Sequence, residues 1–405
     1  MKNGKPRVAF FPDGYHEIDG VAVVARQYES FAREQNLSFL MFHAGPCDEI
    51  VCHGETTRVQ LKRGRIKFPL DRAHDFDLLF SQHSGRVAAL LKEFGPDVIQ
   101  ITGPSDVGIL GMLMAHKLSI PLAAFWQTNL SLYAGKRAAK AFSFLPKGLT
   151  GAVARVAERL SSSAVNRFYK VPRMLFAPNP EIVAALAMAT GRSCFNMGHG
   201  VDADVFHPNH RDRTSDLVTI GYVGRLTAEK NVRWLAQLEK HLLASVSADF
   251  RILVVGEGAE DTWLRANLQC AEFTGVLRGP ALSRAYANMD LLAFPSETET
   301  FGLVVLEALA SGVPAVVTAS GGPKYTVLHN VTGCVAKNVE EFCEFVGVLV
   351  SKPDVLSAMS HAARKFAEEN SWSRAFEGIY HSYAEHLGFP GNPRRLLSVA
   401  ENPGV

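Results

Sequence analysis

The sequence predicts an α/β protein with two doubly wound domains, each built around a parallel sheet. Short continuous apolar runs alternate with helical patterns along almost the whole chain, as in strand–helix–strand units whose sheet is covered on both faces. The chain has 405 residues, of which 47% are hydrophobic, and is too long for one core. The alternation lapses once, over 201–216, where H-P-N-H-R-D-R-T-S-D is polar and contains proline. We therefore expect a linker between two domains there.

The first domain begins with a predicted strand, Arg7 to Phe11, a loop, Pro12 to Gly20, and an amphipathic helix, Val21 to Gln35. The loop ends in glycine just before the helix, which allows a close approach to a phosphate or a sugar. A plain turn is the alternative. Three further helix–strand pairs follow: Ser84 to Phe94 with Asp97 to Ile101, Asp106 to Leu118 with Leu122 to Trp126, and Leu149 to Tyr169 with Met174 to Ala177.

The second domain starts with a predicted strand at Val218 to Val223. Its later strands, separated by helices, are predicted at Arg251 to Val255, Ala271 to Thr274, Asp290 to Phe294 and Ala315 to Thr318. Three helices follow, at Glu340 to Ser351, Pro353 to Asn370 and Ser371 to Leu387. Residues 388–405 have a composition typical of disorder.

Composition and charge exclude several function classes. A formal net charge of +2 gives no global field that would attract nucleic acid. Residues 1–20 lack the apolar region of a signal peptide, and no stretch is long and apolar enough to span a membrane. Six cysteines without a CxxC pair are typical of reduced thiols, so we expect a cytoplasmic protein. His43, Cys47, Cys52 and His53 lie close in sequence, but their spacing matches no zinc pattern.

The most informative stretch, Pro295 to Pro314, reads P-S-E-T-E-T-F-G-L-V-V-L-E-A-L-A-S-G-V-P. Apolar runs flank it at 291–294 and 315–317, so it is predicted to cross between two parallel strands. Ser296 to Gly302 is polar, whereas Leu303 to Ala310 has helical apolar spacing. Free backbone N–H groups at the start of this helix, at the carboxyl edge of the sheet, would bind an anion or a hydroxyl-rich ligand.

Two carboxylates accompany this helix. Glu299 lies in the loop, and Glu307 lies among apolar residues, where an unpaired charge would be costly to bury. We therefore expect Glu307 to have a partner. The vicinal hydroxyls of a ribose or a hexose suit a carboxylate, and so does a basic side chain. The alternative is structural: Glu299 as a capping acid and Glu307 as a salt-bridged core residue.

Two cations follow the strand Val218 to Val223, in the segment G-R-L-T-A-E-K-N. Arg225 and Lys230 leave the sheet edge before a helix and could converge on a diphosphate; a solvated loop is the alternative. The segment V-V-G-E-G-A-E-D partly matches a dinucleotide fingerprint, but Asp261 replaces the third glycine. Hydride transfer is therefore a weaker hypothesis.

These motifs together resemble those of a known family. Six segments resemble the retaining nucleotide-sugar glycosyltransferases of family 4. They are G-R-L-T-A-E-K-N, V-V-G-E-G, F-T-G-V-L-R-G-P-A-L-S-R-A-Y-A-N-M-D, the stretch Pro295 to Pro314, G-G-P-K, and G-V-D-A-D-V-F-H-P before the linker. The similarity is strongest to GDP-mannose-dependent α-mannosyltransferases and sulfoquinovosyltransferases. It covers Arg7 to about Leu387 and is looser in the first domain.

The resemblance implies a GT-B fold with an active site between two Rossmann-like domains. These would be a first domain at 1–205 and a second at 206–370, with a helix at 371–388 returning to the first domain and a disordered tail at 389–405. Three residues would be catalytic: Arg225 and Lys230, on the donor diphosphate, and Glu299, on the sugar. The resemblance also implies donor-binding roles. Glu307 would bind the ribose, and the backbone N–H groups of Phe301, Gly302 and Leu303 would bind the sugar. Val276 and Arg278 would lie near the base, and Gly20 would let the first domain's loop approach the donor.

The resemblance implies no metal and no other cofactor, since two cations and helix N–H groups would stabilise the departing charge. The chemistry would be retaining and front-side, with the leaving phosphate oxygen accepting the acceptor's proton. On the acceptor side, His16 and Gln127 are implied. Many relatives have histidine at the position of Gln127, and glutamine can exchange hydrogen bonds but cannot hold a positive charge.

The expected reaction moves a hexose, mannose from GDP-mannose, onto a lipid or glycan acceptor. The alternatives are a UDP-sugar-dependent glucosyl, galactosyl or sulfoquinovosyl transferase, a nucleotide-sugar epimerase, an oxidoreductase and a non-catalytic sugar-nucleotide sensor. Residues 133–155 add a further hypothesis, peripheral contact with an anionic membrane at its inner face; a solvated connection is the alternative. The stretch has no acidic residue and carries Lys136, Arg137, Lys140 and Lys147 around Phe142, Phe144 and Leu145.

Overall fold

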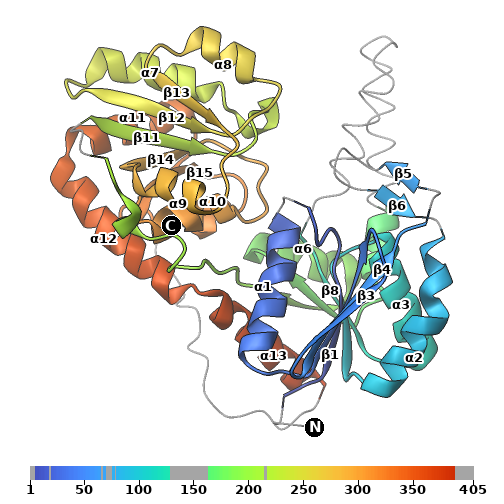
Figure 1. Ribbon diagram of the computed structural model, residues 1–405. Coiled ribbons are helices and arrows are strands. Elements are labelled where there is room, and N and C mark those ends of the chain that lie inside the picture. Colours follow the sequence, from blue (N-terminus) through green and yellow to red (C-terminus); the bar gives the residue numbers. More distant parts are fainter. Residues whose placement is uncertain are drawn as a thin grey trace.

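The computed structural model describes residues 5–17, 20–64, 67–69, 75–77, 79–127, 163–213 and 217–387. Figure 1 shows two α/β domains side by side, each with helices packed around a sheet. The chain passes from the first domain to the second just after residue 200 and returns through α12 (Pro353–Glu369) and α13 (Trp372–His386). The predicted pair of doubly wound domains is confirmed.

The first domain contains an eight-stranded sheet in the order β10-β9-β8-β7-β1-β2-β4-β3. All its strand pairs are parallel except β3 with β4. The strands are β1 (Val8–Phe11), β2 (Phe39–Gly45), β3 (Glu49–His53), β4 (Thr56–Lys62), β7 (Val98–Ile101), β8 (Leu122–Phe125), β9 (Met174–Ala177) and β10 (Ser193–Asn196). The helices are α1 (Gly20–Glu34), α2 (Ser84–Phe94), α3 (Asp106–Leu118) and α6 (Pro180–Thr190). A small ribbon, β5 (Lys67–Pro69) with β6 (Asp75–Asp77), lies outside this sheet.

The second domain contains a six-stranded, fully parallel sheet in the order β13-β12-β11-β14-β15-β16. The strands are β11 (Val218–Val223), β12 (Phe250–Val255), β13 (Ala271–Gly275), β14 (Leu291–Phe294), β15 (Ala315–Thr318) and β16 (Gly333–Ala336). The helices are α7 (Trp234–Ser245), α8 (Asp261–Asn267), α9 (Gly279–Ala287), α10 (Leu303–Ala310) and α11 (Val339–Ser351). Chain order reverses between β11 and β14, so the loops after these strands diverge and leave room for a ligand. The corresponding point of the first sheet lies between β1 and β7.

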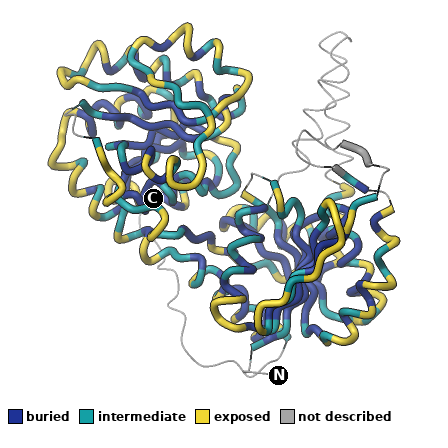
Figure 2. The backbone as a smooth tube through the Cα atoms, viewed as in Figure 1, coloured by how far each residue is buried: buried dark blue, intermediate teal, exposed yellow. Residues whose placement is uncertain are grey.

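The extent of burial explains which strands could be predicted from the sequence. The central strands β1, β7, β8, β9, β14 and β15 are buried at every position, as Figure 2 shows in dark blue, and their apolar runs were predicted. Edge strand β3 is almost wholly exposed, and its composition carries no such signal. Strand β2 is buried and apolar, so it could have been predicted but was missed, as were β4, β10 and β16. The predicted helix Leu149 to Tyr169 and the tail 388–405 fall largely outside the described residues.

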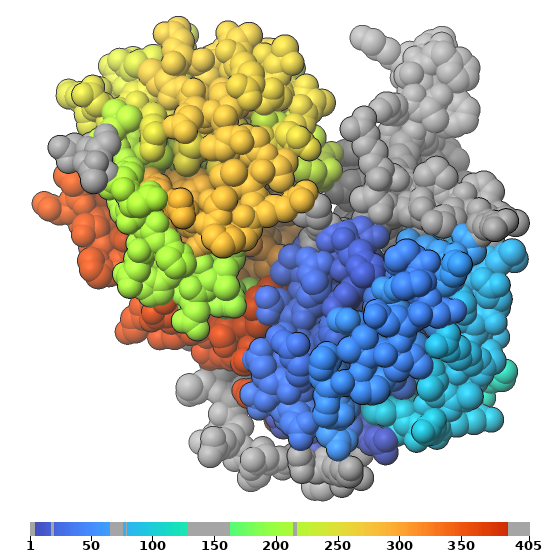
Figure 3. All heavy atoms as spheres, in the orientation of Figure 1, coloured from blue at the N-terminus to red at the C-terminus, as the bar shows by residue number. Residues whose placement is uncertain are grey.

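Helix α13 belongs to the core of the first domain, although it follows the second domain in sequence. Its residue Phe376 is fully buried and stacks on Tyr28 of α1, with ring centroids 4.6 Å apart. Further along the helix, the Tyr383 hydroxyl donates a 2.6 Å hydrogen bond to Gln100 Oε1 on β7. Figure 3 shows the residues of α12 and α13, in red and orange, running from the second domain onto the blue residues of the first. The last helix therefore ties the two domains together.

The Phe376→Ala variant tests this anchor. Removing a fully buried ring should lower the free energy of unfolding by about 3 to 5 kcal/mol, because a cavity opens beside Tyr28. Urea denaturation followed by tryptophan fluorescence measures it, and Trp372, one of the four tryptophans, stacks on Phe376. The control is Val348→Ala on the exposed side of α11, which should change stability by less than about 0.5 kcal/mol. Equal urea midpoints for Phe376→Ala and the wild type would show that α13 does not hold the first domain.

Candidate active site

The carboxyl edges of the two sheets meet. Thr300, in the loop after β14, donates a 3.0 Å hydrogen bond from Oγ1 to the main-chain oxygen of Gln127, which follows β8. Leu303, the first residue of α10, lies 3.6 Å from the position that a side chain on Gly20 would occupy at the start of α1. The loops that the sequence singled out in each domain are therefore brought together.

Lys230 and Glu299, both predicted site residues, form an ion pair at the point where chain order reverses. The distance from Lys230 Nζ to Glu299 Oε1 is 2.5 Å, and the lysine side chain is only 9% exposed, against 31% for the glutamate. The main chains of the two loops are also joined, since Asn231 Nδ2 donates to the Pro295 carbonyl at 3.2 Å. A charged ligand could take the place of either partner: an anion could replace Glu299 beside Lys230, and a hydrogen-bond donor could replace Lys230 beside Glu299.

Arg225 follows β11 as predicted, but its side chain is 60% exposed and pairs with Glu229 at 3.1 Å. Glu229 was not predicted as part of the site. Two glycines, Gly224 and Gly256, lie in close contact beside Arg225. Gly256 has φ +137°, and a side chain there would lie 1.9 Å from the Gly224 carbonyl oxygen. This glycine pair explains the V-V-G-E-G segment as close packing between neighbouring loops.

The N-terminus of α10 supplies the predicted backbone donors. Gly302 precedes the helix with φ +94°, a left-handed conformation that favours glycine, and a side chain there would meet Pro323 Cγ at 2.9 Å. Among the described residues, the N–H groups of Phe301, Gly302 and Leu303 donate to no acceptor in the surrounding loops. The helix dipole adds partial positive charge at the same place, so this end of α10 can hold an anion or sugar hydroxyl groups.

Glu307 has the partner that its environment requires. The Tyr286 hydroxyl, on α9, donates a 2.7 Å hydrogen bond to Glu307 Oε2. The expectation of a partner is confirmed, although this partner is a tyrosine hydroxyl and not the basic side chain considered from the sequence. Burial raises the pKa of Glu307 to about 6, against the lowering effect of Tyr286. Since burial also raises the pKa of Tyr286, the tyrosine remains a donor across the neutral range.

Val276 and Arg278 follow β13 and are exposed at the same carboxyl edge. Strand β13 is the edge strand, two positions from β11. The two residues therefore lie farther from the Lys230–Glu299 pair than the residues after β11 and β14 do. Such a position suits contact with the outer end of a long ligand.

In the first domain, His16 and Gln127 have different surroundings. His16 is exposed, and its Nε2 lies 3.0 Å from Gln60 Oε1 on β4. Gln127 lies beside Thr300, and its side-chain Oε1 and Nε2 are buried without a hydrogen-bond partner in the described part of the chain. Buried polar atoms are nearly always paired, so the Gln127 amide requires partners outside the described residues, and a ligand's donor and acceptor groups would suit it.

The sequence missed three residues at the meeting of the domains. Asn179 Nδ2 donates to the Thr300 carbonyl at 2.8 Å, and the His199 ring stacks on Phe301 with centroids 4.2 Å apart. Glu181 pairs with Lys324 of the G-G-P-K segment at 2.6 Å. Desolvation lowers the pKa of His199 to about 4, so its ring is neutral at pH 7. The Asn-Pro pair before α6 does signal a helix start, but no sequence pattern reveals a partner in the other domain.

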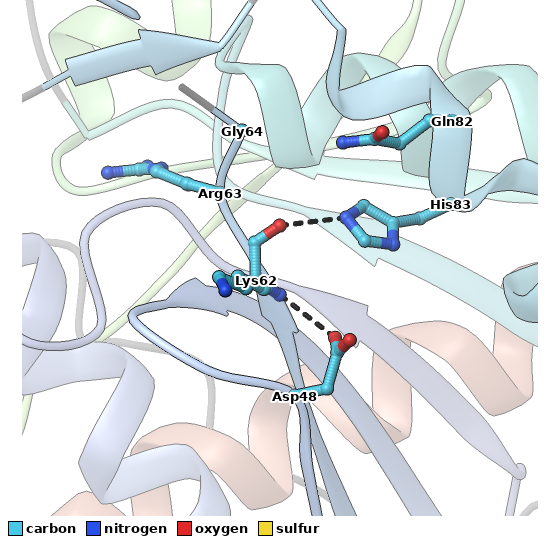
Figure 4. A pocket seen from close by; sticks show the side chains of 6 residues that line it. All are labelled: Asp48, Lys62, Arg63, Gly64, Gln82 and His83. Atoms are coloured by element: carbon cyan, nitrogen blue, oxygen red, sulfur yellow. Dashed lines mark hydrogen bonds between the residues drawn. The ribbon is translucent and has the colours of Figure 1, made fainter. Parts of the chain in front are cut away.

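A separate pocket of about 470 Å³ lies at the end of β4, shown in Figure 4. Its polar groups are partly paired with one another: Asp48 Oδ1 accepts from the Lys62 main-chain N–H at 3.0 Å, and His83 Nε2 lies 2.9 Å from the Lys62 carbonyl. The pocket is lined by Asp48, Lys62, Arg63, Gly64, Gln82 and His83.

The described residues contain no cluster of three or more His, Cys, Asp or Glu side chains placed to hold a metal. His43 instead stacks on Tyr15, with centroids 4.3 Å apart, and burial lowers its pKa to about 4.

In the part of the chain that the structure describes, no helix is long and apolar enough to cross a membrane. The basic, aromatic stretch 133–155 lies outside the described residues.

Comparison with known proteins identifies the family. Residues 218–352 match the family described as Glycosyl transferases group 1. A GDP-mannose-dependent alpha-mannosyltransferase of Mycolicibacterium smegmatis is 32% identical over 323 residues, covering 78% of this chain and 79% of that protein. The fold matches a sucrose-phosphate synthase from Thermosynechococcus elongatus with TM-score 0.71 and 16% identity, covering 94% and 99% of the two chains. It also matches an Anabaena protein, HepE, in complex with UDP and glucose, with TM-score 0.63 and 16% identity over 95% and 99%.

The family match, the curated relative and the solved structures agree with the geometry described above. The two mainly parallel sheets, the facing carboxyl edges and the returning last helix are those of the predicted GT-B fold, and the solved structures confirm it. The identity to the mannosyltransferase over more than three quarters of each chain is sufficient to assign the family. The chain is a glycosyltransferase and belongs to the group 1 glycosyltransferases.

Proposed function

We propose that this glycosyltransferase moves mannose from GDP-mannose to a lipid or glycan acceptor, with retention of configuration. The Lys230–Glu299 ion pair beside the N-terminus of α10 carries the proposal, because it places a cation, a carboxylate and helix N–H groups within one ligand's reach. The name of the mycobacterial relative supports mannose and GDP. A UDP-sugar donor is the second candidate, since HepE, which shares the fold at 16% identity, was solved in complex with UDP and glucose.

In this proposal, the bound donor replaces the contacts that the site residues make with one another. The diphosphate takes Lys230 and Arg225, whose ammonium and guanidinium groups suit phosphate oxygens. Glu299, released from Lys230, accepts hydrogen bonds from sugar hydroxyl groups, with the N–H groups of Phe301, Gly302 and Leu303 beside it. Glu307 accepts from the ribose hydroxyls while Tyr286 orients its carboxylate. The base extends toward Val276 and Arg278.

The proposed chemistry needs no protein base. The acceptor oxygen bonds to the anomeric carbon on the face from which the phosphate leaves. The bond from that carbon to the phosphate oxygen breaks, and the same phosphate oxygen takes the acceptor's proton. Lys230, Arg225 and the N-terminus of α10 stabilise the charge that develops on the diphosphate. These groups supply the charge that a divalent ion provides in other transferases, so the proposal includes no metal or other cofactor.

The acceptor lies on the first domain in this proposal. Gln127, with both amide atoms unpaired among the described residues, binds an acceptor or donor hydroxyl, and Gly20 leaves room for the donor. His16 and the pocket at the end of β4 extend the same edge, and Lys62 and Arg63 there suit an anionic part of the acceptor. Contact of 133–155 with an anionic membrane remains a prediction.

Replacing either cation tests the diphosphate assignment. Arg225→Ala and Lys230→Ala should each lose about 2 to 4 kcal/mol of transition-state stabilisation, read as kcat/KM for GDP-mannose, because donor charge would face a partly desolvated site. Arg233→Ala is the matched control: it lies just beyond the same loop and pairs with Glu260, away from the proposed donor. Turnover within threefold of wild type in both cation variants would remove the assignment.

The two glutamates should separate nucleotide binding from sugar transfer. Glu307→Gln should weaken calorimetric binding of GDP. Glu299→Gln should leave GDP binding at least as strong as in the wild type and reduce transfer, because in the proposed complex Glu299 contacts the sugar and no longer Lys230. Glu307 also predicts a pH dependence. Its pKa of about 6 means that the carboxylate is protonated at pH 5 and loses acceptor capacity, so GDP should bind more weakly at pH 5 than at pH 7.

The Glu307→Gln variant controls for protonation of GDP itself, which is common to both proteins. Its affinity should fall less between pH 7 and pH 5 than that of the wild type. Equal losses of GDP affinity in the two glutamate variants, or parallel pH profiles for Glu307→Gln and wild type, would contradict the roles assigned here.

A further inference from the structure

The donor loop, residues 296–302, is held from the first domain as well as from its own. Three successive strands of the first sheet, β8, β9 and β10, each end near it. The Gln127 carbonyl after β8 accepts from Thr300, Asn179 after β9 donates to Thr300, and His199 after β10 stacks on Phe301. The loop therefore lies between two domains whose relative position affects it directly.

Asn179 uses both ends of its amide. Its Oδ1 accepts from the Ile182 N–H at 3.0 Å and caps α6, while its Nδ2 donates to the Thr300 carbonyl at 2.8 Å. The side chain is almost fully buried, at 3% exposure. Capping fixes the oxygen toward the helix, so the nitrogen must point across to the second domain. One residue thus joins the start of α6 to the donor loop.

The first turn of α6 makes a second contact with the other domain. Glu181 pairs with Lys324, and the hydrogen bond from Lys324 is the main cause of a lowered Glu181 pKa. Lys324 follows Pro323, which a side chain on Gly302, at the start of α10, would meet at 2.9 Å. Figure 1 places α6 on the side of the first domain that faces the second. The first turn of α6 therefore contacts the donor loop and the segment that supports it.

We propose that Asn179 is a positioning residue for the transfer reaction: from the first domain, it holds the Thr300–Gly302 backbone in the orientation that binds the transferred sugar. This inference rests on the proposed role of the donor loop. When the domains separate, the loop loses the Asn179 hydrogen bond and its N–H groups are no longer fixed. Nucleotide binding depends on second-domain residues and persists, so transfer is coupled to domain closure.

Two substitutions separate this role from helix capping. Aspartate and serine cap helices as well as asparagine does, but neither donates an N–H to Thr300. Asn179→Asp and Asn179→Ser should therefore keep the melting temperature within a few degrees of wild type. Their kcat/KM for transfer should fall about tenfold, as expected for one lost hydrogen bond at a buried site. GDP affinity should stay within about threefold, a split that a general loss of structure would not produce.

The control is Asn338→Asp, which changes an equivalent cap of α11, where Asn338 Oδ1 accepts from the Glu341 N–H away from the first domain. It should behave as wild type. Small-angle X-ray scattering adds a readout independent of the sugar: both Asn179 variants should show a larger radius of gyration than Asn338→Asp. Wild-type transfer rates and an unchanged radius in both Asn179 variants would overturn the proposal. A larger radius with wild-type transfer would keep the interdomain contact but overturn its role in the reaction.

Discussion

The ion pair between Lys230 and Glu299 is the interaction on which the site depends. It joins the loops after β11 and β14, the two strands between which chain order reverses in the second sheet. The lysine side chain is nearly buried, and an unpaired cation there would be costly, so a negative partner is required at all times. A diphosphate can replace the carboxylate as that partner, which frees Glu299 for a sugar. One exchange would thus bind the phosphates and prepare the sugar site together.

The two-domain architecture makes that exchange sensitive to closure. Helix α13 fixes the end of the chain to the first domain through a buried aromatic cluster, while the donor loop receives Gln127, Asn179 and His199 from three strand ends. The hinge is narrow, because a side chain on Gly200 would overlap the Trp372 main chain. The two crossings of the chain therefore run side by side. His199, which stacks on Phe301 of the donor loop, directly precedes Gly200 of this hinge.

The fold and part of the site follow from sequence because their signals are local. Buried parallel strands require continuous apolar runs, and α10 is marked by its helix formers after a polar loop. The sequence therefore predicted α10 and β15 with correct ends and β14 to within one residue. Glu307 was expected to have a partner because a buried carboxylate needs one, but Tyr286 is 21 residues away and nothing in its own segment marks it as that partner. Asn179 and His199 act across the domain interface, and no single-chain periodicity encodes such contacts. Arg225 pairs with Glu229, which shows that cation spacing alone does not fix side-chain direction.

The central claim is that the site binds GDP-mannose and transfers mannose from the face that the phosphate leaves. Slow hydrolysis of the donor, with water in place of the acceptor, tests it without knowledge of the acceptor. The pure protein would be incubated with GDP-mannose and with UDP-sugars, and proton NMR would follow the anomeric signals. If GDP-mannose is the donor and configuration is retained, GDP-mannose is consumed and α-mannose appears first. Hydrolysis of a UDP-sugar alone, or β-mannose as the first product, would contradict it.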